Sequence, residues 1–126
     1  ERLEKGIPNL VLEFAKKIDA CDFLVISFAE NNGSYNAAFK NLMDWTSLIP
    51  NRKTFADKPM LLLATSPGPR GGQSVLEAAA ARLPFMGGQI KATFSLPSFQ
   101  QNFDQENGKI SNEELDLALK AIIAKL

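Results

Sequence analysis

The sequence contains no histidine and only one cysteine, Cys21, among its 126 residues. Without histidine, Ser–His and Cys–His nucleophilic schemes and histidine ligation of metals are excluded. A single cysteine excludes a disulfide within the chain and favours a reducing compartment, so a cytoplasmic protein is expected. Cys21 itself, between a predicted helix and a predicted strand, is interpreted as a small packing residue. Chemistry in this protein must therefore come from a bound cofactor or from carboxylates.

The chain also lacks an excess of either charge and lacks long apolar runs. Its 14 Lys and Arg residues balance 14 Asp and Glu residues, which predicts neither a nucleic-acid partner nor an anionic membrane surface. The longest apolar runs hold about six residues, far fewer than the roughly 20 that span a bilayer. No segment is typical of a secretory signal. The length fits one domain with a hydrophobic core.

Helices and strands alternate strictly along the sequence. Predicted helices cover residues 9–20, 35–47 and 73–86, and a last helix begins at a capping box in residues 111–114. Predicted strands cover residues 23–28, 60–65 and 90–96. The residues expected to face inward from these helices are Val11, Phe14, Ala15, Ile18, Ala38, Leu42, Trp45, Leu76, Ala79, Ala80, Leu83, Leu115, Ala118, Leu119, Ile122 and Leu126. This order predicts an α/β fold with a parallel sheet.

The strand patterns predict which strands lie at the edges. Residues 23–28 and 60–65 are almost wholly apolar, as in strands buried on both faces, whereas residues 90–96 alternate as in a half-exposed edge strand. If the strands lie in chain order, with right-handed crossovers, residues 23–28 form the other edge. A buried-type strand at an open edge invites pairing. We therefore expect a further strand beside it, from an absent N-terminal segment or from a partner chain.

Two polar, glycine-bearing loops follow the first two strands. In open parallel sheets the ligand crevice lies at the carboxyl ends of the strands, so these loops predict a site for a planar or anionic ligand. The candidate binding residues are Glu30, Asn31, Asn32, Gly33, Ser34, Ser66, Pro67, Gly68, Arg70, Gly71 and Gly72. No residue is assigned a catalytic or metal-binding role.

The same residues carry a resemblance. Ala29-Glu-Asn-Asn-Gly-Ser34, followed by Phe39-Lys-Asn-Leu-Met-Asp-Trp45, resembles the NADPH-dependent FMN reductase family of flavodoxin-like folds. That family carries Pro-Glu-Tyr-Asn-Gly-Ser and Lys-Asn-x-x-Asp-Trp in these places. The segment of residues 66–72 is similar to its glycine-rich second flavin loop. The sequence departs from the pattern at Ala29, where the family has Pro, and at Asn31, where it has an aromatic residue near the flavin.

The resemblance implies a three-layer flavodoxin-like domain. Residues 1–126 would supply strands 3, 4 and 5 of a five-stranded sheet ordered 2-1-3-4-5. The N-terminal β-α-β portion, with its loop for the FMN phosphate, would be absent. The resemblance also implies FMN as cofactor, NADPH or NADH as co-substrate, and a small-molecule electron acceptor such as a flavin, a quinone, an azo dye or a metal oxyanion. Members of the family are commonly homodimers or homotetramers, and residues 35–47 are expected to take part in the contact.

The resemblance and the residues assign roles within the loops. Backbone N–H groups of residues 31–34 would bond the flavin pyrimidine, Gly33 would allow close approach, and Arg70 would face anionic groups. Glu30 is interpreted as an anchor that accepts backbone N–H groups rather than as a general acid. Trp45 is assigned to the core or a subunit contact, and Phe99 and Phe103 to covering the sheet end.

Plainer interpretations remain open for several of the loop residues. Residues 32–34 are also typical of a simple turn and helix cap. The glycines within residues 68–72 are typical of a sharp strand-to-helix turn, and Arg70 can be a solvated surface charge. Two other functions stay open as well. One is a non-catalytic fragment or interaction module that no longer binds FMN. The other is an electron carrier, which the neutral charge disfavours.

Overall fold

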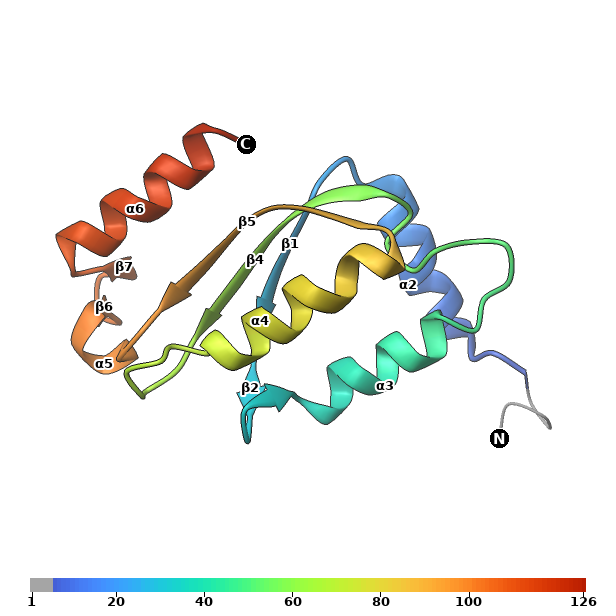
Figure 1. The fold of residues 1–126 in the computed structure, drawn as a ribbon, viewed down its shortest axis with the longest axis horizontal. Helices are drawn as coiled ribbons and strands as arrows, with labels where there is room; N and C mark the ends of the chain where they lie inside the picture. Colours follow the sequence, from blue (N-terminus) through green and yellow to red (C-terminus); the bar gives the residue numbers. More distant parts are fainter. Residues whose placement is uncertain (1–5) are drawn as a thin grey trace.

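The computed structural model describes residues 6–126, and its centre is a three-stranded parallel sheet (Figure 1). The strands are β1 (Leu24–Phe28), β4 (Lys58–Thr65) and β5 (Gly88–Leu96), hydrogen-bonded in the order β1-β4-β5. Both neighbouring pairs are parallel. The predicted α/β class and the chain-order arrangement of the strands are confirmed.

Helices cover this sheet. Helix α3 (Ala37–Thr46) connects β1 to β4, and helix α4 (Gln73–Arg82) with the short helix η1 (Leu83–Met86) connects β4 to β5. Both lie on one face, as right-handed crossovers require, and α2 (Asn9–Ala20) packs beside α3 (Figure 1). Helix α6 (Glu113–Ala124) runs beside β5, with Ile122 next to Ala92. The remaining elements, at the carboxyl ends of the strands, are β2 (Glu30–Asn31), β3 (Ser34–Tyr35), α5 (Phe99–Asn102), β6 (Phe103–Asp104) and β7 (Lys109–Ile110).

The core lies between the sheet and the face covered by α2, α3 and α4. Its buried members are Ile18, Phe28, Met43, Phe55, Met60, Leu62, Ala64, Val75, Leu76, Ala79 and Leu83. Along β4 the core side chains are alternate residues, because successive side chains of a strand point to opposite faces. Leu61, on the other face, is buried as well, so β4 is the strand buried on both faces that its sequence predicts.

Strand β1 is packed on one face only, which corrects the prediction of burial on both faces. Leu24 and Ile26 pack against the core, whereas the intervening Val25 is 60% exposed. Within residues 6–126, β1 pairs with β4 alone. Its outer edge and its second face therefore have no cover from the described part of the chain.

A bulge changes the faces of β5. Met60 pairs with Ile90, but Leu61 pairs with Ala92, so Lys91 is an extra residue in β5. Ile90 consequently packs against the core, while Ala92 points to the opposite face. The half-exposed edge strand is confirmed, but its apolar residues do not share one face as the simple alternation predicts.

Helices α3 and α4 also differ from the expected patterns of buried residues. In α3 the buried residues are Met43 and Thr46, while Ala38 is exposed, because a rotation of one residue turns the longer side chains inward. Thr46 is accommodated because its hydroxyl donates to the Leu42 carbonyl at 2.6 Å. In α4, Val75 is buried and Ala80 is exposed.

The last helix begins one residue later than its capping box predicts. Asn112, not Ser111, is the N-cap, and its side-chain oxygen accepts from the Leu115 N–H at 3.1 Å. The Asn112 amide also donates to Asn102 at 3.1 Å. This second bond fixes Asn112 to the preceding segment, which explains why it displaces serine as the cap. No residue of α6 is buried, and Ala118 and Leu126 are exposed rather than inward.

Candidate functional site

The two predicted ligand loops lie next to each other at one edge of the sheet. Because β1 and β4 are parallel neighbours with Phe28 opposite Ala64, the segments that follow them leave from the same end. Figure 1 shows the three strand arrows pointing to this edge, where the β2–β3 hairpin, the loop before α4 and α5 are gathered. The sheet therefore brings the candidate residues of both loops together, as the sequence predicts.

The first loop is a short hairpin. Strands β2 and β3 pair Glu30 with Tyr35 and Asn31 with Ser34, leaving a two-residue turn. Both turn residues have positive φ, 51° at Asn32 and 77° at Gly33, as in the Asn-Gly turns that suit two-residue hairpins. Residues 31–34 are exposed, and a Cβ added to Gly33 would meet no atom within 4 Å. The hairpin tip has open space in which a ligand can approach the backbone.

The second loop is held against the segment that follows β5. The N–H groups of Ser98 and Phe99 donate to the carbonyls of Gly68 and Ser66 at 2.9 and 3.0 Å. Pro67 is exposed, and a Cβ on Gly68 would meet only the Ser66 hydroxyl, at 3.9 Å. The first half of this loop thus offers an open backbone surface.

The second half of the same loop is packed tightly. A Cβ on Gly71 would lie 2.4 Å from the Ser95 hydroxyl and 2.7 Å from backbone atoms of Pro97. A Cβ on Gly72 would lie 2.7 Å from the Ala64 side chain. Both glycines have positive φ, 58° and 78°. Packing and backbone conformation therefore demand glycine at these two positions, whatever ligand the loop holds.

The two charged candidate residues, Arg70 and Glu30, make different kinds of hydrogen bond. Arg70 is exposed, and its guanidinium donates to the Ser74 hydroxyl at 3.3 Å. The Glu30 carboxylate accepts a hydrogen bond from the backbone N–H of Val75 at 3.1 Å. Glu30 thus bonds a backbone N–H group, as the anchor interpretation expects, and the group belongs to α4.

Comparison with known proteins decides the family. Residues 1–101 match the model of the NADPH-dependent FMN reductase family. The chain belongs to this family. Over 125 residues it is 34% identical to an NADPH:quinone oxidoreductase of Arabidopsis thaliana, covering 94% of this chain and 61% of that protein. Over 112 residues it is 30% identical to a quinone reductase of Escherichia coli strain K12, covering 87% of this chain and 59% of that protein.

A solved structure confirms the flavodoxin-like fold of this FMN reductase family member. The solved structure is that of FerB, a flavoenzyme NAD(P)H:(acceptor) oxidoreductase from Paracoccus denitrificans. This chain is similar to it with a TM-score of 0.76 and 21% sequence identity. The match covers 98% of this chain and 71% of the FerB chain. The chain thus spans about three-fifths of the length of the curated relatives. None of the helices within residues 6–126 has the length and apolar character needed to cross a membrane.

Sequence reasoning assigned Phe99 and Phe103 to covering this end of the sheet, but it missed that the end of β5 and the segment after it hold the second loop. The residues after β5 hold the second loop in place, and the Ser95 hydroxyl donates to the Gly71 carbonyl at 2.8 Å. The rings of Phe99 and Phe103 stack with centroids 5.0 Å apart. The position of Ser95 at the end of the third parallel strand, and of Pro97 directly after it, was the available signal, because the carboxyl ends of parallel neighbours meet at one edge.

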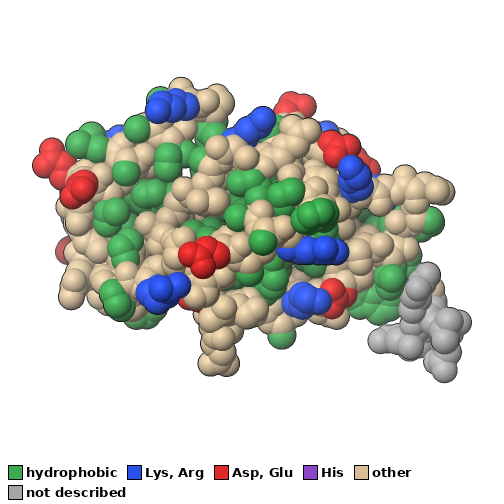
Figure 2. Space-filling model, viewed as in Figure 1, with side chains coloured by type: hydrophobic (Ala, Val, Ile, Leu, Met, Phe, Trp, Pro, Cys, Tyr) green, Lys and Arg blue, Asp and Glu red, His purple; other side chains and the backbone are tan. Residues whose placement is uncertain are grey.

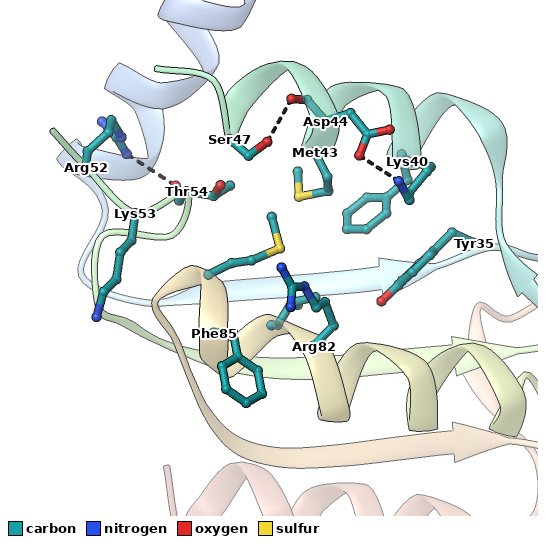
Figure 3. Close-up of a pocket in the computed structure, with 13 residues that line it drawn as sticks. Tyr35, Lys40, Met43, Asp44, Ser47, Arg52, Lys53, Thr54, Arg82 and Phe85 are labelled. Atoms are coloured by element: carbon teal, nitrogen blue, oxygen red, sulfur yellow. Dashed lines mark hydrogen bonds and ion pairs between the residues drawn. The ribbon is translucent and has the colours of Figure 1, made fainter. Parts of the chain in front are cut away.

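The family member also has a groove that the sequence did not predict, between α3 and the α4–η1 segment (Figure 3). Its volume is about 350 Å³. The residues lining it are Tyr35, Phe39, Lys40, Met43, Asp44, Ser47, Arg52, Lys53, Thr54, Arg82, Leu83, Phe85 and Met86. Figure 2 shows apolar side chains on this helix-covered face, with both signs of charge interspersed among them.

Tyr35 is the most unusual residue of the groove. Its ring packs against Phe28 and Phe39, with centroids 6.0 and 5.2 Å away, while its buried hydroxyl has no hydrogen-bond partner among the described residues. Burial raises the pKa of the Tyr35 hydroxyl, and the positive charges of Lys40 and Arg82 partly oppose this shift. Tyr35 is therefore a neutral donor at physiological pH.

Proposed function

We propose that this protein is an FMN-dependent NAD(P)H oxidoreductase whose acceptor is a flavin, a quinone or a similar small molecule. The observation that carries the proposal is the meeting of two exposed loops at one edge of a parallel sheet, in a chain of the FMN reductase family. The names of the matched relatives, quinone reductases and NAD(P)H oxidoreductases, support it.

In this proposal the protein binds and orients the flavin ring rather than reacting with it. The chemistry that bound FMN would supply is hydride transfer from the nicotinamide cofactor and onward reduction of the acceptor. The backbone of residues 31–34 would hold one side of the ring, and residues 66–68 would hold the other. The open space at Gly33 and Gly68 fits a planar group close to both backbones. Exposed Arg70 is placed to meet an anionic part of either cofactor.

The remaining candidate residues contribute to the proposed flavin site in different ways. Asn32 and Ser34 contribute through their backbone, and Pro67 through the shape of its loop. Gly71 and Gly72 have a packing role that is sufficient to explain them. Cytoplasmic localisation is part of the proposal, because the single cysteine fits a reducing compartment.

Spectroscopy and a rate measurement test this function. Purified protein should bind FMN with about 1:1 stoichiometry, show flavin absorbance bands and oxidise NADPH or NADH when a quinone is added. Without FMN binding, the second candidate, an interaction module, would stand. The exposed outer face and edge of β1 favour that candidate, because Val25 is 60% exposed there. Flavin that is bound but not reduced by NADPH or NADH would instead support an electron carrier.

We propose that a further parallel strand lies beside β1, as part of a β-α-β portion N-terminal to the flavodoxin-like unit of residues 1–126. Within the described residues 6–126, the outer edge of β1 has no neighbouring strand and Val25 is exposed, and both observations support this arrangement. Residues 24–28 should then show slow amide exchange in the native protein. Fast exchange along the outer edge of β1, comparable with exposed loops, would contradict the proposal.

We also propose that a second copy of the chain packs on the groove between α3 and α4, giving a homodimer or homotetramer. Phe85, which is 76% exposed beneath the Arg82 guanidinium, supports a contact there. The Tyr35 hydroxyl, which has no hydrogen-bond partner within residues 6–126, supports it as well. Light scattering should give a dimer or tetramer mass that Phe85→Glu lowers. The matched control Leu117→Glu, at a 57% exposed position on α6, should keep the native mass. A monomeric wild-type protein would refute this contact.

A further inference from the structure

Glu30 connects the two loops of the candidate site. Its carboxylate Oε1 accepts from the backbone N–H of Val75 at 3.1 Å, across 45 residues of sequence. Glu30 begins the hairpin that follows β1, and Val75 is the third residue of α4, directly after the glycine-rich loop. One hydrogen bond therefore joins the base of the first loop to the end of the second.

Helix α4 needs this bond because it has no cap of its own. Its N-cap is Gly72, which lacks a side-chain acceptor, and its first turn has no acidic residue. The first N–H groups of a helix have no partner within the helix and are usually bonded by the N-cap side chain. A Cβ on Gly72 would meet Ala64 at 2.7 Å, so the loop excludes a capping side chain. Glu30 supplies the missing acceptor from another segment, with a charge that suits a helix N-terminus.

The hairpin, in turn, needs an anchor to have a fixed position. It has only two residue pairs and an exposed tip, and so short a hairpin is not stable by itself. Glu30 and Tyr35 form the pair at its base, and both are anchored. The Tyr35 ring packs into the core beside Phe28, and the Glu30 carboxylate is bonded to α4. These two anchors determine where the tip, residues 31–34, lies relative to the second loop.

We infer that Glu30 is a positioning residue for the flavin, not a flavin ligand. Its bond to the Val75 N–H fixes the position of the hairpin relative to the start of α4, and so sets the spacing between the hairpin tip and residues 66–68, where the flavin ring would lie. The inference rests on the proposed function, in which the flavin lies across both loops. The Glu30 side chain thus bonds the protein backbone and does not bond the flavin.

Three variants test the inference. Glu30→Ala removes the acceptor, and Glu30→Gln keeps an acceptor oxygen without the charge. Glu77→Gln is the control, at an exposed carboxylate on the same helix that accepts from the Gln73 amide. For each, FMN affinity is measured by flavin fluorescence, the absorption bands of bound FMN are recorded, and amide exchange is followed at Val75 and residues 31–34. Thermal unfolding checks that each variant is folded.

The expected results differ between the variants. Glu30→Ala should weaken FMN binding by about tenfold or more, the scale of a lost charge-assisted hydrogen bond. It should also shift the bands of residual bound FMN and speed exchange at Val75. Glu30→Gln should restore slow exchange and bring affinity within about threefold of wild type, since amide oxygens accept N–H bonds. Glu77→Gln should change none of these.

Two results would overturn the inference. One is Glu30→Ala with wild-type FMN affinity and unchanged Val75 exchange. The other is Glu30→Gln with affinity as poor as Glu30→Ala but with slow Val75 exchange, which would mean that the carboxylate contacts the flavin itself. If wild-type protein binds no FMN, the proposed function fails separately. The exchange rates at Val75 and residues 31–34 then decide whether Glu30 holds the two loops together.

Discussion

Replacing Gly71 with alanine tests whether the glycine-rich loop is fixed by packing. The new Cβ would lie 2.4 Å from the Ser95 hydroxyl and 2.7 Å from backbone atoms of Pro97. A hydroxyl can rotate away, but the backbone of Pro97 cannot, so the loop or the segment after β5 must shift. The shift would also break the 2.8 Å hydrogen bond from Ser95 to the Gly71 carbonyl.

The magnitude follows from three contributions. Alanine at φ 58° costs about 1–2 kcal/mol relative to glycine. Overpacking against backbone adds about 1–3 kcal/mol, and the lost hydrogen bond about 1 kcal/mol. We therefore expect Gly71→Ala to lower the free energy of unfolding by about 3 kcal/mol or more. With a urea m-value of about 2 kcal/mol/M, the unfolding midpoint falls by about 1.5 M.

Gly68→Ala is the matched control in the same loop. Gly68 has no positive φ, and a Cβ there would meet only the Ser66 hydroxyl, at 3.9 Å. Its free energy of unfolding should stay within about 0.5 kcal/mol of wild type, while FMN affinity falls because the methyl group narrows the open side of the loop. Urea unfolding followed by circular dichroism measures both variants. Equal midpoints for Gly71→Ala and wild type would refute the packing argument.

Two further predictions concern α3 and the groove beside it. Asn36→Ala removes the N-cap of α3, whose side-chain oxygen accepts from the Phe39 N–H at 2.8 Å, so the free energy of unfolding in urea should fall by about 1 kcal/mol. The control Asn41→Ala, at an exposed position of the same helix, should not lower it. Tyr35 is the sole tyrosine of the sequence, so tyrosinate absorbance reports its pKa directly, and burial should hold the midpoint above the usual value of about 10. Because the pKa of Tyr35 is raised in the folded state, the buried neutral hydroxyl contributes fully to stability below pH of about 10, and this contribution is lost as pH rises through the folded pKa. A titration midpoint at or below about 10 would contradict the burial of the hydroxyl.

The strand order and the place of the site followed from local sequence patterns. Apolar runs that end in polar, glycine-bearing loops are properties of short segments, and the handedness of crossovers fixes the rest. The positions of β1, β4 and β5, and the meeting of the loops after Phe28 and Thr65, were therefore predictable. Helix α2 matched its predicted bounds and its apolar stripe for the same reason.

Details that depend on contacts between distant segments were not predictable. The cap of α6 moved to Asn112 because its amide bonds Asn102, and the bulge at Lys91 turned Ile90 to the core. In α3, Met43 lies in the core and Phe39 packs against Phe28 of β1, and no helical period in the sequence reveals these contacts.

The candidate site shows most clearly which features the sequence determines and which depend on the tertiary structure. The sequence alone determined that two loops meet at one sheet edge, since parallel neighbours must end together. Only the tertiary structure decided that Glu30 bonds the Val75 N–H and that Gly71 lies against Pro97. Those partners stand 45 and 26 positions away in the chain, so their contact depends on how the sheet, α4 and the segment after β5 pack together.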